Sequence, residues 1–191
     1  MGMHASLCDF LTDIAQNSFE ADATNVGIVI EQNENWIIFS VTDDGKGMSP
    51  DQQKRALDPF YSDGIKHKKR KVGLGLPFLY QMVESVGGEF SLSSEVGKGT
   101  VVYYTVPLSH IDTPPLGDIP STLSSLFSYP SSADLIVKRA ANRNEIREEY
   151  EVSKSELLEV LQEVNTVSNI ILMKTFLQSQ EAAIEEFLQR V

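Results

Sequence analysis

The sequence predicts an α+β domain in which helices cover one face of a mainly antiparallel sheet. Three observations support this prediction. Apolar residues recur at helical spacing in some stretches and at every second position in others. These stretches follow one another in the order helix, two strands, loop, helix, two strands. The chain has 191 residues, 41% of them hydrophobic, which suffices for one medium domain and a smaller second part.

The predicted elements of the first domain, residues 1–108, form two helix-plus-hairpin units. Their expected bounds are a helix over 3–20, strands over 24–31 and 35–43, a short helix from 49, a second long helix over 74–86, and strands over 89–95 and 100–108. Turn residues separate the strands, and Gly87-Gly88 is expected to close the second long helix.

The remainder of the chain divides into two further predicted parts. Residues 109–132 hold four prolines among many serines, which predicts a linker or an extended strap rather than a packed element. Residues 133–191 predict a β-hairpin followed by two or three amphipathic helices. Ser153 and Glu156 have the spacing of a capping box and mark the start of the first of these helices.

Composition restricts the function classes. The formal charge of −11 opposes nonspecific nucleic-acid binding, because phosphates would be repelled. No apolar run approaches the length of about 20 residues that a membrane span needs, and no leader pattern opens the chain, so we expect a cytoplasmic protein without a membrane partner. The single Cys8 excludes an internal disulfide and a cysteine-based metal site; its helical apolar setting predicts core packing.

Two polar motifs stand at the edges of the first predicted elements. Asp13 and Asn17 are one turn apart on the polar side of the first helix. An amide oxygen can hold Mg²⁺ together with phosphate oxygens, and a nearby carboxylate can orient or deprotonate a nucleophile. Asp43-Asp44-Gly45-Lys46-Gly47-Met48 ends a strand, where a carboxylate can accept a hydrogen bond from an adenine amino group. Taken singly, the first motif also fits solvated polar residues and the second an ordinary glycine turn.

Two glycine motifs follow in the second half of the domain. Val72-Gly73-Leu74-Gly75-Leu76 enters the second long helix, where exposed backbone N–H groups and the helix N-terminus can bind phosphate. Gly97-Lys98-Gly99-Thr100 lies at the tip of the last hairpin and alone is typical of a simple hairpin turn. The four motifs in this order and spacing favour a common nucleotide site.

Together these motifs resemble the ATP-binding domain shared by histidine kinases, anti-sigma-factor serine kinases, gyrase B, Hsp90 and MutL, known as the GHKL superfamily with the Bergerat fold. The resemblance covers residues 3 to 108, with Pro59-Phe60 matching the F box. It implies ATP and Mg²⁺ as cofactors, with Asn17 as the metal ligand, and a catalytic position at Asp13. The cofactor-binding residues that it implies are Asn17, Asp43, Gly45, Gly47, Met48, Gly73, Leu74, Gly75, Leu76 and Thr100.

The resemblance also implies that residues 63–72 form the ATP lid, which favours phosphate or partner contact for the basic run Lys66–Lys71 over simple solvation. A histidine kinase carries a phospho-acceptor helical hairpin before this domain, whereas only three residues precede His4, so self-phosphorylation is not expected. Asp13 replaces the catalytic glutamate of gyrase-type ATPases and anti-sigma kinases and is one methylene shorter.

Two functional hypotheses remain open. The first is an enzyme that phosphorylates a partner protein in trans or slowly hydrolyses ATP. The second is a non-catalytic, ATP-gated switch that captures a regulatory partner of unknown identity. The apolar helices after residue 153 are expected to serve core or homodimer packing, with partner capture as the alternative.

Overall fold

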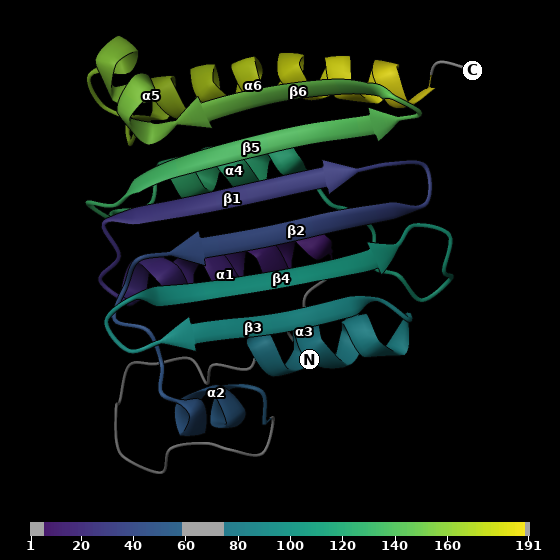
Figure 1. Cartoon of the computed structure of the whole chain (residues 1–191). Coiled ribbons are helices and arrows are strands. Elements are labelled where there is room, and N and C mark those ends of the chain that lie inside the picture. The colour runs from purple at the N-terminus through teal and green to yellow at the C-terminus, as the bar shows by residue number, and fades with distance from the viewer. Residues whose placement is uncertain (1–5, 59–74, 190–191) are drawn as a thin grey trace.

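The computed structural model describes residues 6–58 and 75–189. Six strands form one sheet in the order β3-β4-β2-β1-β5-β6 (Figure 1). The strands are β1 (Asn25–Gln32), β2 (Trp36–Asp43), β3 (Glu89–Glu95), β4 (Gly99–Pro107), β5 (Asp134–Arg143) and β6 (Ile146–Ser153). Neighbouring strands are antiparallel except β1 and β5, which are parallel. The sheet is therefore mixed and mainly antiparallel, as the sequence predicts.

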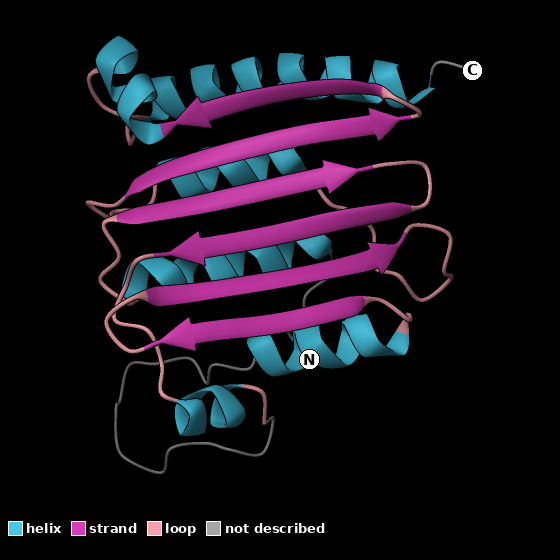
Figure 2. Cartoon of the chain, in the orientation of Figure 1, coloured by secondary structure: helices cyan, strands magenta, loops and turns pink. Residues whose placement is uncertain are grey.

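Helices form the second layer of the molecule. The helices that the structure describes are α1 (Leu7–Glu20), α2 (Pro50–Ala56), α3 (Gly75–Ser85), α4 (Ile119–Phe127), α5 (Lys154–Leu161) and α6 (Val167–Gln189), and α2 lies beyond the β3 edge of the sheet (Figure 1). Contacts link α3 to α1, α1 to α4 and α4 to α6, so these four helices lie side by side across one face of the sheet (Figure 2). The α+β sandwich with helices on one face is thus confirmed.

Helix α1 begins at a complete capping box. The Asp9 N–H donates to Ser6 Oγ at 3.3 Å, and the Ser6 N–H donates to Asp9 Oδ2 at 2.9 Å. Its apolar side, including Leu7, Leu11 and Ile14, is buried against the sheet. The opposite side of the helix therefore carries its polar residues toward solvent.

The inward faces of the central strands form the core. Alternate residues of β1 and β2 are buried, which confirms the predicted period of two: Val26, Ile28, Ile30, Ile37, Phe39 and Val41. Register places Ile28 opposite Val41, and the rings of Phe39 and Tyr104 stack at 4.9 Å. Packing of this core holds β2 in place, and Asp43, the first predicted site residue on the strands, is the last residue of β2.

The predicted linker over residues 109–132 is wrong for its central part. Residues 119–127 form α4, whose first turn is capped by the Asp118 carboxylate, which accepts from the Ser121 N–H at 2.9 Å. Four apolar residues at helical spacing bury the helix: Ile119, Leu123, Leu126 and Phe127. The prolines of this segment do not prevent a helix, because Pro120 stands in the first turn of α4, where proline is tolerated.

The sheet continues beyond residue 108. Strand β5 pairs in parallel with β1 along its length, from Asn25 opposite Asp134 to Gln32 opposite Ala141. The C-terminal hairpin therefore extends the same sheet and shares its core. The division of the chain into folding units at residues 108 and 132 stays a prediction.

A buried polar cluster joins the last helix to the sheet. The Arg139 side chain is buried, with Nε 3.3 Å from Glu181 Oε1 of α6, and its Nη2 donates to Gln32 Oε1 at 2.6 Å. Its Nη1 donates to the Ala140 carbonyl at 2.9 Å, and the Tyr150 hydroxyl donates to Glu181 Oε1 at 2.7 Å. Burial and the Glu181 charge raise the pKa of Tyr150. The cluster spans β1, β5, β6 and α6.

No helix within residues 6–58 and 75–189 combines the length and the apolar character that a bilayer crossing requires.

We expect Glu181→Ala to lower the free energy of unfolding by about 3–5 kcal/mol, because the buried Arg139 guanidinium loses its counter-ion. Urea denaturation measures the effect. The matched control is Lys138→Ala, which removes the exposed Lys138–Glu151 pair and should cost about 1 kcal/mol or less. Equal losses in the two variants would contradict a stabilising role of the cluster.

Candidate functional site

Asp43 presents a buried, oriented carboxylate at the end of β2, with 7% of the residue exposed. The Ser18 hydroxyl of α1 donates to its Oδ2 at 2.7 Å, and the Gly45 N–H donates to its Oδ1 at 3.0 Å. A carboxylate oxygen can accept two hydrogen bonds, so each retains capacity for a donor on a ligand. Sequence reasoning missed Ser18; the signal was a polar residue on the apolar side of the first helix.

The neighbouring Asp44 has a structural role, unlike Asp43. Its carboxylate accepts from the backbone N–H groups of Thr24 at 2.7 Å and Asn25 at 2.8 Å. It also accepts from the Thr24 hydroxyl at 2.6 Å and the Asn25 amide at 2.7 Å. These bonds, chiefly from the Thr24 and Asn25 side chains, hold the pKa of Asp44 well below its usual value. Asp44 therefore anchors the turn after β2 to the start of β1, while the Asp43 carboxylate faces α1.

Glycines let two loops meet at backbone distance. Gly47 has φ +63°, and a Cβ there would lie 1.9 Å from the Glu95 carbonyl oxygen. Gly99 has φ +103°, and its Cβ would lie 1.8 Å from the Asp43 carbonyl oxygen. The β3–β4 hairpin is thereby held against the turn that carries Asp43 and Gly45.

Thr100 and Met48 belong to the same loop contact. Thr100 is opposite Asp43 in the β2–β4 register, and its Oγ1 lies 2.9 Å from Ser94 Oγ. Ser94 Oγ also accepts from the Met48 N–H at 2.8 Å, and the Gln53 amide donates to the Ser94 carbonyl at 2.8 Å. Ser94 and Gln53 thus attach the start of α2 to the hairpin. Neither residue stands out in the sequence, because their polar positions match ordinary strand and helix surfaces.

A second group of predicted residues lies between α1 and α3. A Cβ on Gly75 would lie 2.8 Å from Asp13 Oδ2, so this carboxylate packs against the first turn of α3. Asn17 follows one turn later on α1 and is exposed, and Leu76 is partly buried. Gly73, Leu74, Pro59-Phe60 and the predicted lid at 63–72 lie outside the described residues.

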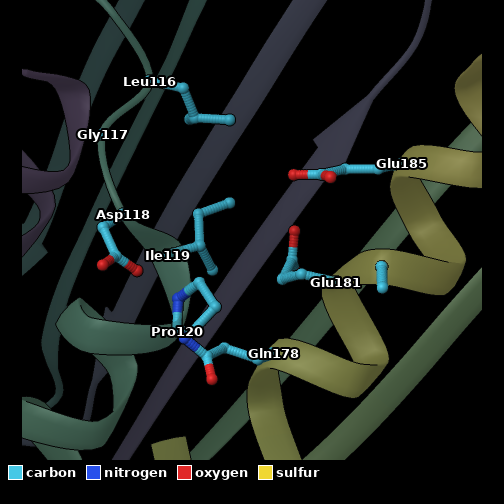
Figure 3. A pocket seen from close by; sticks show the side chains of 9 residues that line it. Leu116, Gly117, Asp118, Ile119, Pro120, Gln178, Glu181 and Glu185 are labelled. Atoms are coloured by element: carbon cyan, nitrogen blue, oxygen red, sulfur yellow. The ribbon is translucent and has the colours of Figure 1, made fainter. Parts of the chain in front are cut away.

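A cavity between α4 and α6 does not suit a triphosphate. A cavity of about 440 Å³ lies between the start of α4 and α6, and Asp118, Glu181 and Glu185 are part of its wall (Figure 3). Three carboxylates on this wall would repel phosphate groups. Among the residues that the structure describes, no three acidic, histidine or cysteine side chains are grouped as a metal site.

Comparison with known proteins decides the family. Residues 4–110 match the family described as histidine kinase-, DNA gyrase B-, and HSP90-like ATPase. The chain belongs to this family. The match includes every site residue that the sequence predicts, and membership in this ATPase family supports ATP binding and a kinase-like role.

The similar proteins are much longer than this chain. Sporulation kinase E of Bacillus subtilis (strain 168) is 36% identical over 99 residues, which are 50% of this chain and 13% of that protein. Sensor histidine kinase DcuS of Escherichia coli (strain K12) is 28% identical over 107 residues, which are 54% of this chain and 19% of that protein. The chain spans less than a fifth of the length of these two relatives.

The fold is shared over a longer stretch. A crystal structure of the N terminal domain of a DNA repair protein matches 78% of this chain and 52% of that chain, with a TM-score of 0.51 and 13% identity. This is more of the chain than residues 4–110 contain, so the shared fold reaches beyond the ATPase match. At this identity the likeness shows the fold alone.

We expect Gly99→Ala to abolish the close contact between the hairpin and Asp43, because the added Cβ would overlap the Asp43 carbonyl. Nucleotide affinity, measured by calorimetry, should fall at least tenfold, and the unfolding temperature should drop. Gly97→Ala is the matched control: its φ is +77°, but nothing lies within 4 Å of the new Cβ. It should cost only the left-handed strain of about 1–2 kcal/mol. Similar nucleotide affinities in the Gly99→Ala and Gly97→Ala variants would contradict a role of this contact in nucleotide binding.

Proposed function

We propose that this chain binds Mg²⁺-ATP as an ATPase domain of the histidine-kinase type. It either phosphorylates a partner protein in trans or slowly hydrolyses ATP. The observation that carries the proposal is the buried Asp43 carboxylate, whose two oxygens are oriented by Ser18 and Gly45. A charged acceptor with remaining capacity at the end of a strand suits the exocyclic amino group of adenine.

The loops around Asp43 fit the edge of a planar base. Gly45 lies beside the carboxylate, since a Cβ there would be 3.0 Å from Asp43 Oδ1, and Thr100 lies opposite Asp43 on β4. Gly47 and Met48 follow Gly45 in the same segment after β2. The Gly45 position is closely confined, since a Cβ there would lie 2.7 Å from the Ala21 carbonyl. We assign these residues to the adenine end of the site.

The polar side of α1 and the start of α3 suit the phosphates. Asn17 is exposed in the last turn of α1, and its amide oxygen is a hard ligand that can complete a Mg²⁺ shell made of phosphate oxygens and water. Gly73, Leu74, Gly75 and Leu76 are assigned to the phosphates, whose charge the N-terminus of α3 favours.

Asp13 is the proposed catalytic residue, and its position also supports an alternative. In the enzyme, its carboxylate would orient a water or hydroxyl at the γ-phosphate. Its contact with Gly75 favours a second role, in which the carboxylate holds α1 against α3. A chain of that kind would be an ATP-gated switch that captures a regulatory protein. The cytoplasmic location expected from the sequence stays a prediction.

We expect Asp43→Ala to weaken ATP binding about ten- to a hundredfold, since a hydrogen bond to a charged group contributes about 1.5–3 kcal/mol. The preference for ATP over GTP should also decrease, because the exocyclic amino group is the feature that Asp43 recognises. Calorimetry with both nucleotides measures these effects. Asp112→Ala, which removes an exposed carboxylate after β4, is the control and should bind normally. Unchanged ATP affinity of Asp43→Ala would reject its assignment.

We expect Asp13→Ala to reduce release or transfer of labelled γ-phosphate by at least about a hundredfold, with ATP affinity changed by only a few-fold. The control is Glu20→Ala, which removes an exposed carboxylate from the end of the same helix. Retained turnover would exclude Asp13 as the catalytic group. If the native chain gives no turnover with any tested partner while ATP binds, the switch is supported instead.

A further inference from the structure

The outward surface of helix α6 has few charged residues before Glu185 and Glu186 in its C-terminal part, although the chain as a whole carries −11. Between Val167 and Ala183 the only charged residues are Lys174 and Glu181. Glu181 is buried beside Arg139, and Lys174 Nζ lies 3.8 Å from Asp118 at the start of α4. Glu181 is therefore withdrawn from the surface, whereas Lys174, whose side chain is 41% exposed, lies on the side of the helix that faces α4.

This surface is lined by a regular row of exposed residues, which we call the α6 seam. Its members repeat at alternating spacings of four and three: Ser168, Leu172, Thr175, Ser179, Ala182 and Glu186. Apart from Glu186, these residues are small or apolar, and such residues at this spacing allow one helix to pack closely along another. Leu172 is 55% exposed, and Ile171 beside the seam is 61% exposed. The described residues of this chain leave this row uncovered.

Two hydroxyls of the seam are already satisfied. The Thr175 hydroxyl donates to the Ile171 carbonyl at 2.9 Å, and the Ser179 hydroxyl donates to the Phe176 carbonyl at 2.7 Å. These side chains thus offer mainly hydrocarbon to a neighbour, and covering them would leave no new unpaired donor.

The pattern of large and small side chains is self-complementary. If two copies of α6 pack antiparallel about a two-fold axis at the level of residue 177, Leu172 of one copy lies opposite Ala182 of the other. Thr175 then lies opposite Ser179, so Leu172, the one large apolar side chain of the seam, meets a small one. A parallel pair would place Leu172 against Leu172 and leave a gap at Ala182.

Charge favours the same antiparallel arrangement. In this register Glu186, in the last turn of α6, lies opposite Ser168 in the first turn of the other copy. A carboxylate at a helix N-terminus is favourable, whereas the same carboxylate opposes the dipole at the C-terminus of its own helix. Two strongly acidic chains would repel each other along most other surfaces.

We propose that the α6 seam is the interface of an antiparallel homodimer of this chain. With 23 residues, α6 offers a contact roughly 34 Å long. Helix α4, which packs beside α6, adds a surface without a charged residue from 119 to 132. An interface of this size is at the low end of specific interfaces, so we expect a reversible dimer with a dissociation constant in the micromolar range.

The dimer is independent of the proposed nucleotide function. Helix α6 contacts β5 and β6 at one edge of the sheet, whereas Asp43 and Thr100 lie on β2 and β4 (Figure 1). Substitutions in the α6 seam should therefore change association without changing ATP affinity.

The first test measures oligomeric state by sedimentation over a micromolar concentration series. We expect a monomer–dimer equilibrium for the native chain, weakened at least tenfold by Leu172→Glu. Ile111→Glu is the control: it adds the same charge at a residue that is 95% exposed in the segment after β4, and should associate normally. A native chain that is monomeric throughout the series, or a dimer that Leu172→Glu leaves intact, would overturn the proposal.

The second test determines the direction of packing and does not depend on a destabilising charge. Leu172→Cys and Ala182→Cys are purified separately, mixed and oxidised. The antiparallel register predicts a disulfide between the two variants, whereas positions 172 and 172 of a pair would be separated by roughly 15 Å along the helix. Self-linking of each variant in preference to the mixed product would overturn the antiparallel register. The native Cys8 is buried, which raises its pKa to about 11, so it should not compete.

Discussion

The end of β2 is the point at which the sheet, the first helix and the last hairpin of the ATPase match are joined. Ser18 ties α1 to the Asp43 side chain, while Gly99 brings β4 against the Asp43 backbone. The same residue thus takes part in helix packing, in loop packing and in the proposed recognition of adenine. Its carboxylate is oriented before any ligand arrives, and such preorganisation reduces the entropy cost of binding.

The two adjacent aspartates show how environment separates identical side chains. Asp44 is saturated by four donors from Thr24 and Asn25, so it serves the fold. Asp43 receives one hydrogen bond on each oxygen, so it retains acceptor capacity. Sequence position alone places both at the end of a strand. The difference arises because β1 begins beside Asp44, whereas α1 passes beside Asp43.

Much of the fold could be predicted from local patterns. Alternation in β1 and β2, the capping boxes at Ser49 and Ser153, and the glycine turns all depend on near neighbours in the chain. Helix α4 could not be found in this way, because prolines and serines hid its short apolar side. Ser94 and the Arg139 cluster were missed for another reason: each contact joins residues far apart in sequence, so no local pattern reports it. Ser18 has a local signal as a polar residue on the apolar side of α1, but its partner Asp43 is also distant in sequence.

The parallel pairing of β1 with β5 has a consequence for how the chain can be divided. Strand β1 is central and apolar, and one of its two hydrogen-bonding edges is occupied by residues 134–141. A chain shortened to the segment that matches the ATPase family would expose that edge together with Ile28 and Ile30. An open, apolar strand edge invites pairing with other molecules. Because the C-terminal hairpin occupies this edge, we expect a chain shortened to residues 4–110 to aggregate more readily than the full chain.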